Sequence, residues 1–495
     1  MLIINLEFIK IISFKFKMYM LNLGLLAKRK TQVLMDALDS HEDRRPPLHY
    51  LPFIFVALLV GVFSGLAAIF IRQLISLLHN LFFYGVFSDI YQETIPTPPS
   101  SFGPWIILMP VIGAFFVTLL IKEAEPESKG FGVPNVMYSI HYAKGKISVM
   151  GAFIKSVCAC ITIGSGGSAG REGPIIQLGG SIGSFIGQIF KLSVHQRCIL
   201  VAAGAASGIA TTFNAPIGGL VFAIELLLVS INALSIGAVA TATITATLVG
   251  YYFYGLMPVL TFPELSENYS FSGLLLSSLG FLPLGILIGI ASYLFIETLY
   301  IFSKLYNKMI KHPFVRHMLA MFIEGMLLYF MLVYFGFYYV EGLGFSVIQS
   351  ALAGDINTTS LFFIIFLAKL IATALTLGSG GSGGSFLPSL VMGACLGGGY
   401  GALFNSLFPH LHVSQAIFIS SGIGGMLSGT IGAVMTAIVI VPELTNDFYH
   451  AVPNMITVIM AYGVRTLLIR QSIYTVMLHR SGIKMPYGLR GGMLS

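Results

Sequence analysis

Two copies of a glycine-rich loop decide the fold: GSGGSAGREGP at Gly164–Pro174 and GSGGSGGSFLP at Gly378–Pro388. They align without a gap at an offset of 214 residues, and Lys155 and Lys369 pair at the same offset. An apolar run follows each loop, and proline at the end of such a loop is typical of the first turn of a helix. A helix start of this kind presents unpaired backbone N–H groups and the positive end of the helix dipole. Two of them suggest one shared anion site.

Composition indicates an integral, polytopic membrane protein. Of the 495 residues, 56% are hydrophobic and 9% are charged, whereas soluble domains are roughly 25% charged. The 55 glycines fall inside apolar runs, which fits close helix packing and broken helices. The net charge of +7 lies mostly toward the ends of the chain. It therefore indicates topology, and no nucleic-acid partner is expected.

Cysteine and histidine spacing favours neither a disulfide nor a metal site. The four cysteines have no C-x-x-C spacing and stand in apolar surroundings, at Cys158, Cys160, Cys198 and Cys395. Buried, reduced thiols are the expected state. The eleven histidines show no metal-ligand spacing.

The chain divides into a basic tail, two halves and a short end. Residues 1–46 form the tail, which we interpret as cytoplasmic and as either an interfacial amphipathic helix or an over-long start. A polar break at Thr261–Tyr269 separates repeat halves at about 47–258 and 270–480, and 481–495 form a short cytoplasmic tail. Several apolar runs are shorter than the roughly 20 residues of a straight span. Short, interrupted segments at matching places in two halves are typical of transporters with a midplane site.

The repeat extends beyond the loops and predicts inversion. Gly130–Val133 is echoed by Gly342–Phe345, and Glu225 pairs with Glu443. The C-terminal segment is basic, with no acid after Asp447, which predicts that it is cytoplasmic. With both ends inside, two equal copies that each cross an odd number of times must be inverted. We therefore predict an all-α polytopic membrane protein with two inverted-topology repeats, broken and tilted helices, and both loops at mid-depth.

Five ordered motifs resemble the anion-site segments of the CLC family of chloride channels and chloride/proton antiporters. They are Gly130–Pro134 (GFGVP), Gly170–Pro174 (GREGP), Asn214–Pro216 followed by Glu225, Gly384–Pro388 (GSFLP) and Tyr474. The resemblance covers about residues 51–478 and is to the prokaryotic type without cytoplasmic CBS modules. It implies a homodimer in the plasma (inner) membrane, with an anion pathway in each subunit. It implies chloride as substrate, no cofactor and no enzymatic activity.

The resemblance also implies roles for single residues. Glu172 corresponds to the gating glutamate, whose carboxylate occupies an anion position until it swings away or is protonated. Backbone amides of Arg171–Gly173 would hold an outer anion, and those of Ser385 and Phe386 a central one. The hydroxyl of Tyr474 would donate to the central anion from the cytoplasmic side. Neutral donors bind a halide without trapping it.

Two departures from the family pattern affect these roles. Phe131, beside Gly132 in the first motif, stands where many members place a serine hydroxyl on the central anion. Leu226 stands where antiporters often have a second acid, directly after the glutamate that matches Glu225. Because leucine cannot relay a proton, the sequence favours a channel-like conductance. Chloride/proton antiport and transport of another anion, such as nitrate or fluoride, stay open as alternatives.

Structural interpretations and another class of function compete with these roles. Repeated acids such as Glu225 and Glu443 favour a structural role, and Lys155 and Lys369 favour snorkelling or bonds to the backbone. Both loops also match the G-x-S-x-G pattern of serine hydrolases. That pattern makes an intramembrane serine hydrolase a remote alternative, because the nucleophile elbow requires a preceding strand.

Overall fold

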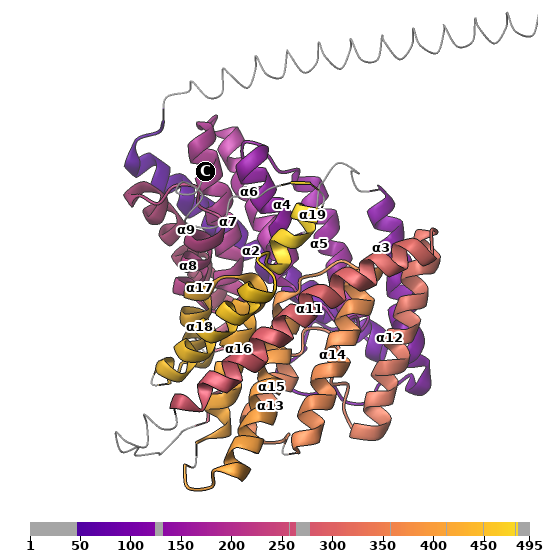
Figure 1. Ribbon diagram of the computed structural model, residues 1–495. Helices are drawn as coiled ribbons and strands as arrows, with labels where there is room; N and C mark the ends of the chain where they lie inside the picture. The colour runs from indigo at the N-terminus through magenta and orange to yellow at the C-terminus, as the bar shows by residue number, and fades with distance from the viewer. Residues whose placement is uncertain are drawn as a thin grey trace, which may run out of the picture.

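The computed structural model describes residues 47–123, 132–256, 258–263, 278–356, 358–411, 413–448, 450–480 and 482–483. Within these ranges the protein is all-helical, and eight of its helices are long and apolar enough to cross a membrane. The prediction of an all-α polytopic membrane protein is confirmed. Figure 1 shows α19 (Ile473–Arg480) at the same end of the molecule as the start of α2, which we call the α19 side.

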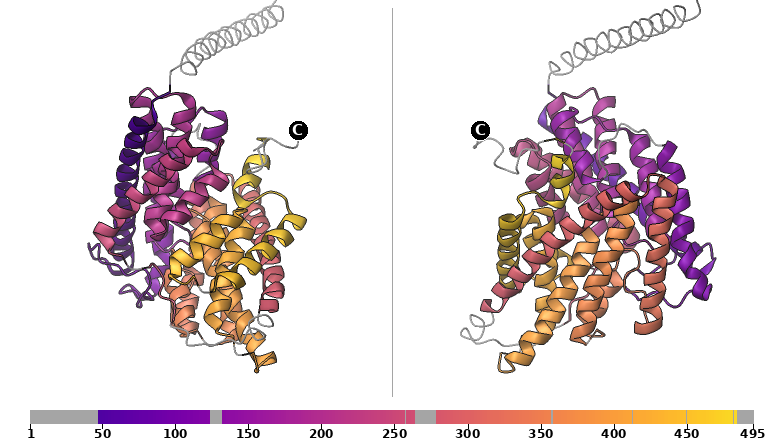
Figure 2. Two further views of the ribbon diagram at one scale, coloured as in Figure 1. Left: turned by 90° about the vertical axis from the view of Figure 1, so that its left-hand side faces the viewer. Right: turned by 45° about the vertical axis from the view of Figure 1, so that its right-hand side comes forward.

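Both halves contain the same series of helices, apart from η1 in the first half and α19 in the second. The first half contains α2 (Tyr50–Tyr84), η1 (Gly103–Leu108), α3 (Met109–Glu123), α4 (Val133–Tyr142), α5 (Val149–Gly164), α6 (Glu172–Ile189), α7 (Val194–Phe213), α8 (Pro216–Leu226) and α9 (Ala233–Tyr254). The second contains α11 (Phe281–Met309), α12 (Pro313–Phe335), α13 (Phe345–Ala353), α14 (Thr359–Ser379), α15 (Phe386–Leu407), α16 (Gln415–Ile431), α17 (Val434–Thr445), α18 (Ala451–Leu468) and α19. The left view of Figure 2 shows the two halves packed against each other.

The two glycine-rich loops meet at the centre and bond to each other reciprocally. Gly170 N–H donates to the carbonyl of Gly384 at 2.8 Å, and Gly384 N–H donates to that of Gly170 at 2.7 Å. Ser168 N–H donates to Thr376 Oγ1 at 3.1 Å, and its counterpart Ser382 N–H donates to Thr162 Oγ1 at 3.4 Å. Each half thus provides hydrogen-bond acceptors for backbone N–H groups in the loop of the other half. This reciprocity fits two inverted repeats around a pseudo-twofold axis.

Equivalent glycines let the helix pairs α6–α7 and α15–α16 approach closely. A methyl group on Gly179 would overlap the carbonyl of Gly204, and one on Gly393 would overlap that of Gly422. Backbones in contact leave no room for a side chain. Small residues at such crossings are what membrane helices use to pack, since water does not drive them together.

Glu225 and Glu443 cap helices of the opposite half. The carboxylate of Glu225 accepts the N–H groups of Met435 and Thr436 at 3.1 and 2.9 Å. The carboxylate of Glu443 accepts those of Ile217 and Gly218 at 3.0 and 2.6 Å. Each acid satisfies unpaired donors at a helix N-terminus and complements its dipole. This is the structural role that their symmetry predicted.

The structure divides one long apolar run of the sequence into two helices, and it confirms the expected role of one lysine. The sequence showed a continuous apolar run over Ala416–Val441. The structure breaks it at Gly432, which has a left-handed φ of 83° and separates α16 from α17. Lys369 is fully buried and donates to the carbonyls of Val340, Glu341 and Gly342 at 2.9–3.3 Å. Bonding to the backbone was its expected role.

Candidate functional site

Glu172, the first residue of α6, points its side chain at the start of α15. Its Oε1 accepts the backbone N–H of Phe386 at 2.7 Å, and the residue is 1% exposed. Phe386 begins α15, so its N–H has no partner within its own helix. The carboxylate lies between Gly170 and Gly384, where a methyl group on either glycine would overlap it. One half therefore supplies a carboxylate and the other supplies its donor.

A cavity of about 190 Å³ opens beside this carboxylate, at the α19 side. It brings together four of the predicted site residues: Gly132, Gly173, Ser385 and Tyr474. Tyr474 comes from α19, which packs on α4 and α16, so the cavity depends on the last helix of the chain. The volume corresponds to several water molecules at about 30 Å³ each. It therefore has room for a hydrated monovalent ion.

The N–H of Gly132 is already occupied within the cavity wall. It donates to Oε1 of Gln177 at 2.8 Å, and Gln177 is buried on α6. Gly132 therefore lines the cavity, but its N–H is already bonded to Gln177. The motifs did not single out Gln177. The neighbouring Phe131 lies outside the described residues.

Arg171 turns its side chain away from the cavity. Its guanidinium pairs with Glu93, a carboxylate in the loop after α2, and its Nη2 donates to the carbonyl of Thr212 at 3.4 Å. Arg72 Nε lies 3.4 Å from the same Glu93 oxygen. Burial raises the pKa of Glu93, but the two guanidiniums outweigh it and lower the pKa below its usual value. The Arg171 side chain thus belongs to a buried ion network and does not line the cavity.

Leu226 lies at the end of α8, half-buried beside the capping acid Glu225. It is absent from the lining of the cavity. Leu226 is therefore separate from the four predicted site residues that line the cavity beside Glu172.

The two serines of the G-x-S-x-G matches are engaged in packing the repeats. Ser168 Oγ bonds to Thr373 Oγ1 at 2.9 Å, and Ser382 Oγ donates to the carbonyl of Lys155 at 3.0 Å. Both loops follow a helix, α5 or α14, rather than a strand. The geometry therefore differs from that of a nucleophile elbow.

Comparison with known proteins decides the family. Residues 113–466 match the family model described as voltage gated chloride channel. The chain belongs to this family, the CLC family. It is 30% identical over 473 residues to the H(+)/Cl(-) exchange transporter ClcA of Vibrio cholerae serotype O1 (strain M66-2), covering 93% of this chain and 94% of the relative. It is 29% identical to the ClcA of Salmonella agona (strain SL483), covering 87% and 89%.

Two solved structures share the fold. The crystal structure of a slow cyanobacterial Cl-/H+ antiporter superposes with a TM-score of 0.74 at 25% identity, covering 88% of this chain and 98% of the other. A CLC-type fluoride/proton antiporter superposes with a TM-score of 0.69 at 22% identity, covering 86% and 97%. The chain is thus a multi-pass integral membrane protein of the CLC type, and it transports anions.

Proposed function

We propose that this protein exchanges chloride for protons, with Glu172 as the group that both ions use. One observation carries the proposal: the carboxylate of Glu172 occupies the N–H of Phe386, a donor that the family resemblance assigns to the central anion. A carboxylate is at once a competitor for anion donors and a proton acceptor. The relatives named as H(+)/Cl(-) exchange transporters support exchange over the channel-like conductance predicted from Leu226.

The proposed exchange follows from competition at the start of α15. Ionised Glu172 takes the N–H of Phe386 and excludes an anion from it. Protonation removes the charge, weakens that hydrogen bond and frees the donor for chloride, because charged acceptors bind about twice as strongly as neutral ones. Chloride would then rest on the amides of Ser385 and Phe386, with the hydroxyl of Tyr474 facing it from the cavity. The amides of Arg171–Gly173 would hold the outer anion.

We propose that the α19 side faces the cytoplasm. Described connections on this side contain several cations, such as Lys144 and Lys146 before α5, Lys191 before α7 and Lys311 before α12. On the opposite side, the described parts of 85–102, 255–263, 336–358, 408–414 and 446–450 contain no lysine or arginine. Excess positive charge marks cytoplasmic loops. Cysteine labelling from outside at introduced sites in these loops tests the orientation.

We also propose that two copies pair, as the resemblance leads us to expect. Helices α8 and α17 pack together but contain only 11 and 12 residues, fewer than a span requires. Their exposed Ile217 and Met435 give this face an apolar surface that a second copy would cover. Crosslinking through Ile217→Cys in a membrane, compared with Leu467→Cys on α18, tests the pairing. If neither cysteine crosslinks, or if both crosslink equally, the α8–α17 face is not the surface on which two copies pair.

The decisive test of exchange is the reversal potential in proteoliposomes under separate chloride and proton gradients. We expect it to lie away from the chloride equilibrium potential and to move when only the pH gradient changes. A chloride gradient alone should drive protons uphill. A reversal potential that stays at the chloride value at every pH gradient would establish a passive conductance instead.

A further inference from the structure

Glu324, on α12, is an intramembrane acid that neither the motifs nor the site around Glu172 explains. It is fully buried, and neither of its carboxylate oxygens has a hydrogen-bond partner. An ionised carboxylate without donors is costly inside a membrane, so the neutral acid is favoured there. Ionisable residues within membrane segments are rare and commonly mark ion or proton pathways.

The face of α12 that carries Glu324 packs against both glycine-rich loops. His317, Met321 and Leu328 share this face at helical spacing and are buried. Carbon atoms built at Gly167 and Gly166 would lie 3.1 Å from Met321 Cε and Leu328 Cδ1. Glu324 therefore lies on α12 between two residues that contact the loop leading to Glu172.

The same face reaches the cavity on the α19 side through His317. A carbon built at Gly381, which lines the cavity, would lie 3.2 Å from His317 Cε1. His317 Nδ1 bonds to Ser379 Oγ at 2.9 Å. One buried helix face thus joins the cavity to the region of Glu324 by way of an imidazole, whose two ring nitrogens can accept and donate hydrogen bonds.

A buried ammonium faces Glu324 from the neighbouring helix. In the described part of the chain, Lys369 on α14 and Tyr306 on α11 interact electrostatically with Glu324. On the side of Gly325, η1 packs through the backbone of Ile107 and contributes no titratable side chain. The ammonium of Lys369 is bonded to three carbonyls and not to Glu324, so it acts on Glu324 only through its charge.

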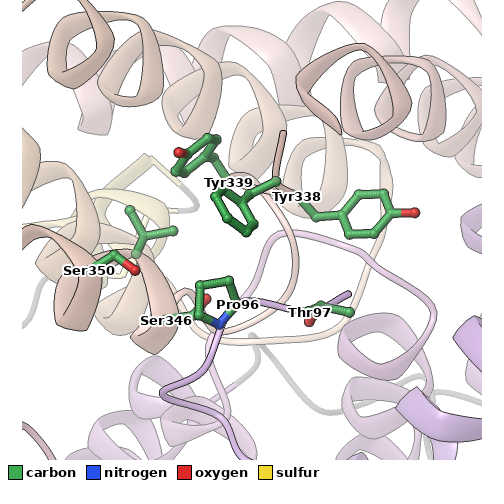
Figure 3. Close-up of a pocket in the computed structure, with 8 residues that line it drawn as sticks. Pro96, Thr97, Tyr338, Tyr339, Ser346 and Ser350 are labelled. Atoms are coloured by element: carbon green, nitrogen blue, oxygen red, sulfur yellow. The ribbon is translucent and has the colours of Figure 1, made fainter. Parts of the chain in front are cut away.

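Lys369 also faces a second acid, Glu341, but the carboxylate of that residue has hydrogen-bond partners. The Glu341 carboxylate bonds to His79 Nε2 at 2.6 Å and to Thr97 Oγ1 at 3.1 Å. Figure 3 shows Thr97 on the loop that faces Tyr338 and Tyr339 across a small pocket. The Glu341 carboxylate therefore has hydrogen-bond partners, whereas the Glu324 carboxylate has none among the described residues.

We propose that Glu324 is a proton-binding residue of the exchange, and that it supplies from the second half the acid that is missing at Leu226. This inference rests on the proposed function. A proton enters from the cavity by way of His317 and water, and converts the Glu324 carboxylate to the neutral acid. Water along the adjacent loop then passes it to the carboxylate of Glu172, which becomes neutral while Glu324 is ionised again. One proton moves in each step, and no other reactant is needed.

The test measures chloride efflux and chloride-driven proton movement together, in proteoliposomes containing the full chain. We expect Glu324→Gln to keep chloride efflux and to lose proton movement by about 10²-fold, the usual contribution of a positioned acid–base group. Glu324→Asp should retain part of it. Glu297→Gln, an acid on α11 that pairs with Arg480, should behave like the unmodified protein.

The outcomes separate this inference from the proposed function. If the unmodified protein moves no protons, exchange itself is refuted, whatever Glu324 does. If the unmodified protein couples and Glu324→Gln couples equally well, the role of Glu324 is overturned. Glu324→Met provides the same test if the glutamine variant does not fold, because its unbranched apolar side chain fits a site that favours a neutral group. Coupling retained in the methionine variant would also overturn the proposal.

Discussion

The two halves of the molecule have the same scaffold but different charges. Equivalent glycines pack α6 on α7 and α15 on α16, and equivalent glutamates cap the short helices. At the tip of the loop, however, Arg171–Glu172 in the first half corresponds to Ser385–Phe386 in the second. Likewise α3 has no titratable side chain before Lys122, whereas α12 buries Glu324. The repeated residues form the helix scaffold, and the ionisable residues of interest stand at positions where the two halves differ.

The largest effect should come from breaking the shared scaffold, in either half. Gly179→Leu and Gly393→Leu each place a side chain where the carbonyl of the facing helix lies. Overpacking commonly costs about 1–3 kcal/mol and more where backbone must move, so we expect both variants to lose the folded protein. Recovery of a monodisperse peak by size-exclusion chromatography measures this.

Gly463→Leu is the matched control, because no atom lies within 4 Å of a carbon built there. It should fold as well as the unmodified protein. A variant at Gly179 that folds normally would contradict the close approach of α6 and α7.

The next effect concerns the loop tip, where the halves differ most. Chloride flux should rise as the pH falls, because protonation of Glu172 releases the N–H of Phe386. Glu172→Gln imitates the neutral form, so its flux should be high and independent of pH. Efflux from liposomes between about pH 4.5 and 7.5 measures this, with Glu297→Gln as control. A folded glutamine variant that keeps the original pH dependence would remove Glu172 from the mechanism.

Repeats and motifs revealed the scaffold and singled out Glu172 because both signals are local in sequence. The duplicated loop, its helix starts and Glu172 can be identified within eleven consecutive residues. Gln177, Glu93 and Glu324 could not be assigned roles this way, because their partners or neighbours come from other elements. The break at Gly432 was missed for a different reason. Glycine is so frequent in the surrounding apolar run that its left-handed conformation had no distinct local signal.

A smaller effect should follow from the symmetric acids, and it should be equal in the two halves. Glu225→Gln and Glu443→Gln each remove a charge that accepts two backbone N–H groups at a helix start. Hydrogen bonds to charged groups contribute about 1.5–3 kcal/mol, part of which the amide oxygen keeps. We expect similar drops in thermal stability from both variants and little change in the pH dependence of transport. A large loss in only one variant would show that the two caps are not equivalent.

The smallest effect should come from Tyr474, a residue without an equivalent in the first half. Its side chain lines the cavity beside Ser385, so in the proposed site its hydroxyl donates one hydrogen bond to chloride. Hydrogen bonds to charged groups contribute about 1.5–3 kcal/mol, and water in the cavity replaces part of this bond in a variant without the hydroxyl, which leaves roughly 2–12-fold in affinity. Tyr474→Phe should therefore weaken chloride binding within this range in a calorimetric titration, while the shape of the pH profile stays set by Glu172. Tyr462→Phe, on α18 against Arg465, is the control. An unchanged affinity in Tyr474→Phe would place the bound anion away from α19 and leave the backbone amides of α15 as its main ligands.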